Sequence, residues 1–119
     1  MEKIETNLEG IVNPSHPPII GVVSLAATAS DLKAGTVLKL SSGAYAAAGN
    51  SDTPAAVLVE DVPGHSSAAV NGKVLFHGLV VESRLLNSSQ EAPNSTLLGK
   101  LPDVGIYLTQ GGWDESRYN

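Results

Sequence analysis

Cysteine is absent from all 119 residues of the chain. Its absence excludes disulfide bonds, thiol chemistry and cysteine-ligated zinc sites, and it leaves the redox compartment open. Aromatic residues are scarce too, at 4% of the chain against 42% hydrophobic residues in total. Because ligand pockets favour aromatic linings, an apolar content made mostly of Ala, Val and Leu indicates thin β-structure and close subunit contacts rather than a deep cavity.

Positive charge is also limited. Seven Lys and Arg residues are scattered among twelve Asp and Glu residues, which gives a formal net charge of −5. A scattered set provides no basic stripe, so we expect neither nucleic-acid binding nor attraction to a membrane. The longest apolar stretches, such as residues 74–81, are too short to span a bilayer, and the acidic residues 1–10 do not resemble a signal peptide. We expect a soluble protein that is made in a cytoplasm.

Recognisable motifs of catalysis and metal binding are missing as well. The histidines His16, His65 and His77 lie in a proline-rich segment, a turn and an expected strand, without the spacing of a helix-borne metal motif. The chain contains neither a phosphate-binding glycine loop nor a Gly-x-Ser-x-Gly elbow. We therefore expect a protein that is not an enzyme and needs no cofactor or metal. A Ser-His-Asp triad assembled from distant positions, and with it a small hydrolase, stays open as an alternative.

What the chain does contain is one domain between two appendages. We assign residues 1–20 to an extended N-terminal arm, 21–110 to a β-rich domain and 111–119 to a polar C-terminal tail. The arm contains three prolines, which lack the donor of a central strand and disfavour helix in the preceding residue. It is either a terminus without function or a segment that binds another protein. The residues that we predict to bind are Ile4, Leu8, Ile11, Val12, Pro14, Pro17, Ile19 and Ile20.

The first half of the domain predicts consecutive strands. Residues 36–40 and 44–46 flank Ser41-Ser42-Gly43, a short glycine-containing connection that is typical of a hairpin. Residues 49–54 are turn formers and lead to a further strand over 55–59.

The second half predicts another hairpin, because Asn71-Gly72 lies between apolar runs. Residues 74–81 form the most apolar strand, in which Gly78 indicates a bulge or the close approach of another backbone. A run this continuous is expected to be covered on both faces. Because the domain has little material to do so alone, we predict a subunit contact there. The residues assigned to this subunit contact are Val74, Phe76, Leu79 and Val80.

The last third predicts short elements. Residues 82–86 indicate a helical turn, and Asn94 or Ser95 is expected to cap a short helix that ends at Pro102. Residues 105–109 predict a final strand. The element pattern is mainly β, a β-rich α+β class with one or two short helices.

The order of these motifs is similar to that of a known family. Residues 34–38, the hairpin to Tyr45 and residues 55–62 form the front half of the similarity. Residues 72–80, Leu85-Leu86 and residues 105–108 form its back half. In this order and spacing, about three quarters of the chain resembles the lambda-type bacteriophage head decoration (capsid-stabilising) proteins. The arm has no family signature, and the tail extends past the usual last strand.

The resemblance implies a small compact domain of β-sandwich or barrel-like "tulip" form with an extended N-terminal arm. It also implies a homotrimer on the outer surface of the expanded head, at local three-fold axes, whose arm contacts the major capsid protein and which stabilises the shell. The protein would then be located on the capsid exterior of a virion. The alternative is a carbohydrate-binding or adhesin-like β module of a virion or cell surface, which usually presents exposed aromatic residues.

Overall fold

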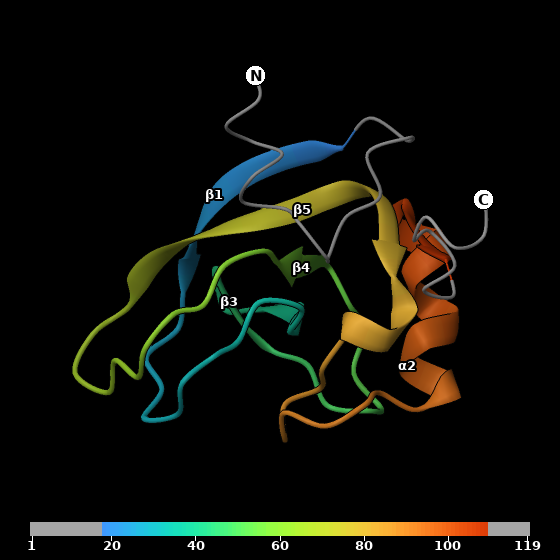
Figure 1. The fold of residues 1–119 in the computed structure, drawn as a ribbon. Coiled ribbons are helices and arrows are strands. Elements are labelled where there is room, and N and C mark those ends of the chain that lie inside the picture. The colour runs from blue at the N-terminus through green and yellow to red at the C-terminus, as the bar shows by residue number, and fades with distance from the viewer. Residues whose placement is uncertain (1–17, 110–119) are drawn as a thin grey trace, which may run out of the picture.

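The computed structural model describes residues 18–109 of the chain. The predicted tail and most of the predicted arm lie outside the described residues. The elements in chain order are β1 (Ile19–Leu25), β2 (Val37–Ser41), β3 (Ala44–Ala47), β4 (Ala56–Leu58), β5 (Val70–Val81), η1 (Glu82–Arg84), α2 (Ser95–Lys100), η2 (Leu101–Val104) and β6 (Ile106–Thr109) (Figure 1). The predicted mainly β class is confirmed.

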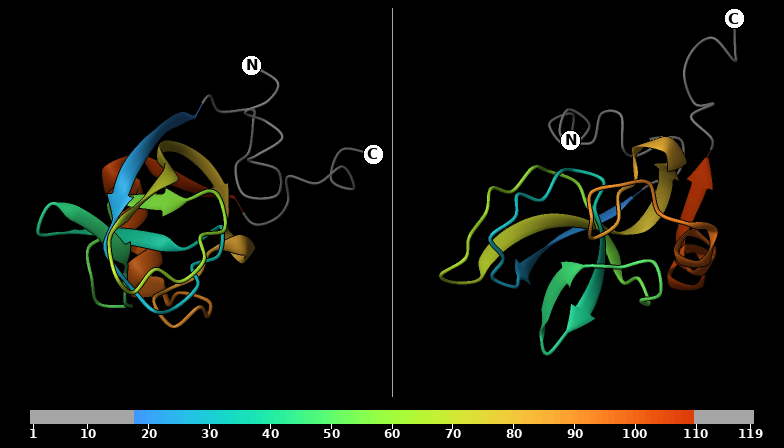
Figure 2. Two further views of the ribbon diagram at one scale, coloured as in Figure 1. Left: turned by 90° about the vertical axis from the view of Figure 1, so that its left-hand side faces the viewer. Right: turned by 90° about the horizontal axis from the view of Figure 1, so that it is seen from below.

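The strands pair in a ring. β1 lies beside β3, β3 beside β2, β2 beside β4 and β4 beside β5, and β5 returns to β1. Five strands thus curl into a small barrel, and β6 adds to β5 in parallel (Figures 1 and 2). The β1–β3 seam is closed only where Leu25 pairs with Tyr45 and the Ala26 N–H donates to the Tyr45 carbonyl at 2.8 Å. The barrel is therefore complete at one end of β1 and open along the rest of that strand.

The first predicted hairpin is confirmed. β2 and β3 pair antiparallel from Leu38 to Ala47, and a two-residue turn joins Ser41 to Ala44. Both turn residues have positive φ, 52° at Ser42 and 85° at Gly43. This backbone matches the twist of the two strands that it connects, and it explains why a glycine follows Ser42.

The second predicted hairpin is wrong. Asn71 and Gly72 lie inside β5, which runs unbroken from Val70 to Val81 and pairs with β1 along its first half. A Cβ atom at Gly72 would lie 2.5 Å from the Leu25 Cδ1 atom. The glycine is thus required by close packing inside the barrel and not by a turn. The chain instead turns before β5, in residues 66–68.

Two apolar clusters fill the domain. The barrel cluster lies on the inner face of the strands, and the helix-side cluster lies between their outer face and the C-terminal helices. The barrel cluster consists of Leu25, Leu32, Leu38, Ala56, Leu58, Val62 and Val74. The helix-side cluster consists of Val37, Ala48, Val57, Val59, Leu75, Val80, Leu85, Leu97, Leu101 and Ile106.

β5 separates these clusters, because neighbouring residues of a strand point to opposite faces. Val74 belongs to the barrel cluster and Leu75 to the helix-side cluster. The expectation that this strand is covered on both faces is therefore confirmed. The cover comes from the same chain, however, because Leu97 of α2 and Leu101 of η2 pack with Leu75 and Val80 over the outer face (Figure 1).

The local predictions around β5 and α2 hold with one change. The pairing of β1 with β5 shifts register between Ile19 and Ile20, and this shift is a bulge close to Gly78. The backbone of Pro18 lies near Gly78, because a Cβ atom added there would be 3.4 Å from Pro18 Cα. The Asn94 side chain caps α2 by accepting the Leu97 N–H at 3.0 Å. α2 ends at Lys100, just before Pro102 as predicted. The one change is that the chain continues into η2, whose first turn tolerates the proline.

Candidate binding surface

Both ends of the described chain attach to the same end of β5. Ile19, the first residue of β1, pairs with His77, and Thr109, the last residue of β6, pairs with Val81. β1 runs antiparallel to β5 and β6 runs parallel to it, so the start of one and the end of the other meet there (Figure 1). The described chain therefore begins and ends on one side of the domain.

An apolar surface lies at these two ends of the described chain. The Ile19 side chain is 58% exposed and that of Tyr107 is 42% exposed, and His77 and Leu79 pair with them across the strands. The His77 and Tyr107 rings meet edge to face at a centroid distance of 6.0 Å. Residues directly opposite each other share one face of a sheet. We call the set Ile19, His77, Leu79 and Tyr107 the exit surface.

The structure moves the boundary of the predicted arm. Ile19 and Ile20 belong to β1, where Ile20 packs against the helix-side cluster and Ile19 joins the exit surface. The arm can therefore extend only as far as Pro18. The other predicted arm residues lie outside the described residues, and their assignment stays a prediction: Ile4, Leu8, Ile11, Val12, Pro14 and Pro17.

The residues predicted for a subunit contact divide into two pairs. Val74 and Val80 are fully buried within one chain, which leaves their side chains no surface for a contact with a second copy. The reason is that the chain itself provides the cover that we had expected from a neighbour: the barrel cluster encloses Val74, and α2 and η2 cover Val80. Phe76 and Leu79 are partly exposed. For these two residues the assignment stays a prediction.

A second apolar region lies at the mouth of the barrel. Leu40 shares the inward face of Leu38 and pairs with Tyr45, yet it is 59% exposed. The Tyr45 and Phe76 rings meet nearly edge on at 6.3 Å. Phe76 also packs on Gly21, where a Cβ atom would lie 2.6 Å from the ring. Sequence reasoning missed Leu40, although its position beside a tight hairpin turn signals that little chain is left to cover it.

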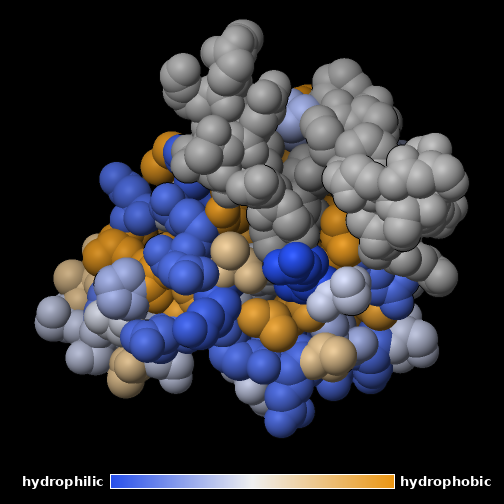
Figure 3. All heavy atoms as spheres, viewed as in Figure 1, coloured by the Kyte–Doolittle hydropathy of each residue, from blue (hydrophilic) through white to orange (hydrophobic). Residues whose placement is uncertain are grey.

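Hydrophobic patches do not merge into one apolar face. In Figure 3, orange patches on the described body alternate with blue hydrophilic ones. The exposed large hydrophobic residues of the described chain are Ile19 and Tyr107 on the exit surface, Val22 on β1 and Leu40 at the barrel mouth. The apolar surface available to a partner is thus concentrated on the exit surface, along β1 and at the barrel mouth.

Asp52, Lys39 and Lys100 hold the loop before β4 in place. The Gly49 N–H donates to Asp52 Oδ2 at 2.7 Å, and Lys39 Nζ lies 3.2 Å from the same oxygen. These two contacts, with the charges of Lys39 and Lys100, hold the pKa of Asp52 below its usual value, although desolvation opposes them. Lys100 Nζ also donates to the Ser51 and Asp52 carbonyls. The arrangement ties the loop before β4 to α2 and to β2.

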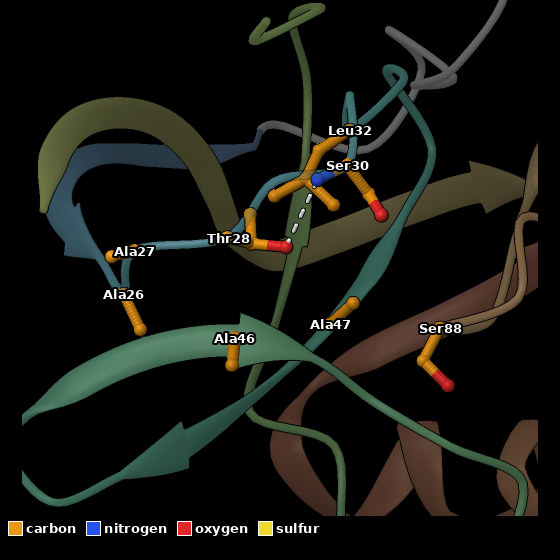
Figure 4. Close-up of a pocket in the computed structure, with 8 residues that line it drawn as sticks. All are labelled: Ala26, Ala27, Thr28, Ser30, Leu32, Ala46, Ala47 and Ser88. Carbon is orange, nitrogen blue, oxygen red and sulfur yellow. Dashed lines mark hydrogen bonds between the residues drawn. The ribbon is translucent and has the colours of Figure 1, made fainter. Parts of the chain in front are cut away.

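A shallow pocket of about 270 Å³ lies where β1 and β3 part (Figure 4). Its lining holds the hydroxyls of Thr28, Ser30 and Ser88, and Thr28 Oγ1 accepts the Ser30 N–H at 3.3 Å. None of the lining residues is titratable, so no side chain there can act as the base that a hydroxyl nucleophile needs. The pocket is lined by Ala26, Ala27, Thr28, Ser30, Leu32, Ala46, Ala47 and Ser88.

Histidine and carboxylate side chains do not gather into a site within residues 18–109. His65 holds a loop, because its two ring nitrogens each lie 2.9 Å from a backbone carbonyl, those of Pro63 and Ala26. In the same part of the chain, no group of three His, Cys, Asp or Glu residues is placed to hold a metal ion. No helix described there has the length and hydrophobicity of a membrane span.

Neither a protein-family model nor a curated protein matches this chain. The resemblance to the head decoration proteins, which rests on the order of small apolar motifs, therefore stays a prediction.

Proposed function

We propose that the protein is a capsid decoration protein that binds as a homotrimer to the outer surface of an expanded bacteriophage head and stabilises it. The observation that supports this most directly is that the described chain begins and ends on one side of the domain, beside the exit surface. A domain with this geometry can press one side against a shell and leave the rest of its surface free.

The arm is the part that would bind the major capsid protein. Its apolar residues and prolines suit an extended peptide that adds to a strand of the shell, where main-chain hydrogen bonds supply affinity. Ordering such a segment costs conformational entropy, so a single arm binds weakly. Ile19 and Tyr107 of the exit surface add apolar contact next to the point where the arm departs.

A trimer offsets this weakness. Three arms that engage one shell raise avidity by about 10²–10⁴-fold through effective concentration. A ligand that prefers the expanded shell stabilises that state by mass action, on the order of a few kcal/mol per site. Of the residues predicted for the subunit contact, Phe76 at the barrel mouth and Leu79 on the exit surface are partly exposed and open to contacts between copies.

The test is co-sedimentation of purified protein with expanded empty heads. The deletion should remove residues 1–17 and keep Ile19 and Ile20, because these two residues belong to β1. We expect the truncated chain to fold, to keep its oligomeric mass and to lose binding. The control is the full chain with Glu2→Ser, which changes the arm outside its apolar residues.

Two outcomes would reject the proposal. Binding of the truncated chain at the level of the full chain would show that the arm is not the capsid contact. A mass of one chain by sedimentation, instead of about 37 kDa for three chains of 12.2 kDa, would remove the trimer.

A further inference from the structure

One edge of β1 has no strand partner over most of its length. β1 pairs with β5 from Ile19 to Leu25, whereas its opposite edge pairs with β3 only at Leu25. Within residues 18–109, no other strand lies against that edge. The edge of residues 19–24 is therefore open, and we call it the open edge.

The backbone groups on the open edge follow from the neighbouring pairings. The Val59 N–H donates to the Lys73 carbonyl at 3.0 Å, so Lys73 directs its backbone toward β4. Because backbone direction alternates along a strand, Val74 and Gly72 face β1 and bond to their partners Gly21 and Val23. Ile20 and Val22 alternate with Gly21 and Val23 along β1. Their backbone N–H and C=O groups therefore point away from β5, toward the open edge.

The open edge lacks the features that usually protect such edges. Residues 19–24 contain no charge and no proline, and their one register shift lies at the first step, between Ile19 and Ile20. Val22 is 65% exposed on this strand. An uncharged, β-branched edge readily accepts another strand, and natural proteins cover such edges.

We propose that residues 7–12 of the same chain fold back and pair antiparallel with the open edge. The N-terminal segment outside the described residues ends at Pro17, and only Pro18 separates it from the start of β1 at position 19, so it leads into the strand that carries the open edge. Residues 13–18 read Asn-Pro-Ser-His-Pro-Pro, a set of turn formers and prolines suited to a reversal. The six residues before them, Asn7 to Val12, match the length of the open edge.

Side-chain alternation sets the register of this hairpin. With residues 13–18 as the connection, Ile11 lies opposite Ile20 and Glu9 lies opposite Val22. Glu9 then shares the outer face of β1 with Lys73, which pairs with Val22 from the other side. A slip by one residue would turn the Glu9 carboxylate toward the barrel cluster. The attraction between Glu9 and Lys73 on either side of Val22, together with the need to keep the Glu9 carboxylate away from the barrel cluster, thus favours the pairing of Glu9 with Val22.

The inference concerns the free chain and does not depend on the proposed function. It implies that the arm covers its own domain until a partner removes it, and that removal exposes the open edge. The proposal is tested by residue-resolved amide hydrogen exchange on the full chain in solution. We expect the Ile20 and Val22 amides to be protected as strand amides are.

Proline substitutions in the arm provide a matched pair of variants. Glu9→Pro removes the N–H that would donate to Val22, so exchange at Ile20 and Val22 should become at least about tenfold faster. Gly10→Pro places the same residue where the N–H points away from β1, and protection should remain. Protection at Val74 should not change in either variant, which verifies that the domain stays folded. An amide-to-amide nuclear Overhauser contact between Glu9 and Val22 of the unmodified chain is expected in addition.

Three results would overturn the proposal. Fast exchange at Ile20 and Val22 in the unmodified chain would mean that nothing covers the edge. Equal protection in the unmodified chain and in Glu9→Pro would mean that the arm is not the cover. Protection that grows with protein concentration would assign the open edge to a second copy of the chain.

Discussion

The two apolar clusters are built in different ways. The barrel cluster is enclosed by strands and loops that come from distant parts of the chain, and it depends on the close approach of Gly72 to Leu25. The helix-side cluster is covered by α2 and η2, which are short helices that follow each other directly. A helix as short as α2 is not stable by itself in water, so packing and its cap must hold it. The barrel cluster thus depends on how closely its strands approach each other, and the helix-side cluster depends on α2 and η2 staying folded over it.

β5 connects the two clusters, because Val74 belongs to the barrel cluster and Leu75 to the helix-side cluster. A change on β5 is expected to affect one cluster or the other according to the face of the residue. A change on α2 affects the helix-side cluster alone. Substitutions can therefore separate the two types of packing.

The largest effect is expected for Val80→Asp. Val80 is fully buried in the helix-side cluster, and a carboxylate there would have no partner. A buried carboxyl without a partner costs several kcal/mol even when it takes up a proton, and the cavity left by the valine adds to this, against a total stability of about 5–15 kcal/mol for a small domain. We expect the variant to be unfolded by circular dichroism. Leu79→Asp, at the partly exposed neighbouring position, should remain folded, and a folded Val80→Asp protein would contradict the packing of the helix-side cluster.

Gly72→Ala is expected to damage the barrel cluster. The new Cβ atom would meet Leu25 Cδ1 at 2.5 Å, and overpacking of this kind costs about 1–3 kcal/mol. The matched variant is Gly99→Ala in α2, where a Cβ atom would meet nothing within 4 Å. That change should stabilise the protein by about 0.5–1 kcal/mol, because alanine favours helix over glycine. Urea unfolding of both variants measures the difference, and shifts of the same sign would contradict the comparison.

Asn94→Ala tests how far the helical cover depends on its cap. The substitution removes the side-chain acceptor of the Leu97 N–H, and the loss of such a cap costs about 1 kcal/mol. Urea unfolding should show a lower midpoint with an unchanged slope. Asn94→Asp, which keeps an acceptor, is the control and should retain most of the stability. A loss as large in the control as in Asn94→Ala would mean that the cap is not the cause.

The smallest effect is expected for Asp52 at acid pH. Because its pKa is lowered in the folded state, this group adds stability above its unfolded pKa of about 3.9, and that stability is lost as the pH falls through the folded value. We expect Asp52→Asn to lose less Tm than the unmodified chain between about pH 6 and about pH 3. The control is Glu91→Gln, which alters an exposed carboxylate outside this loop. Its loss of Tm over the same pH range should equal that of the unmodified chain. If Tm fell equally with pH in all three proteins, ionised Asp52 would add no stability to the folded state.

The two turn signals of the sequence show what local patterns can predict. Ser42-Gly43 forms a hairpin turn because the strands on either side pair with each other directly. Asn71-Gly72 carries an equally strong local signal, but the partner of this segment is β1, which lies far away in the sequence. The pairing with β1 and the contact with Leu25 outweigh the preference of the dipeptide. The same limit applies to the candidate surface, because pairing across β5 brings Ile19 and Tyr107 to one end of the domain.

The sequence by itself determined the mainly β class, the first hairpin and the cap of α2. Each of these depends on backbone dihedral preferences or on hydrogen bonds between residues close in the chain. Only the tertiary structure decided the closure of the barrel by β1, the covering of β5 by its own chain and the placement of both ends of the described chain on one side. Those features depend on contacts between segments that lie far apart in the chain, such as Leu25 with Tyr45, Gly78 with Ile106 and Ile19 with His77. No local pattern encodes which partner such a segment meets.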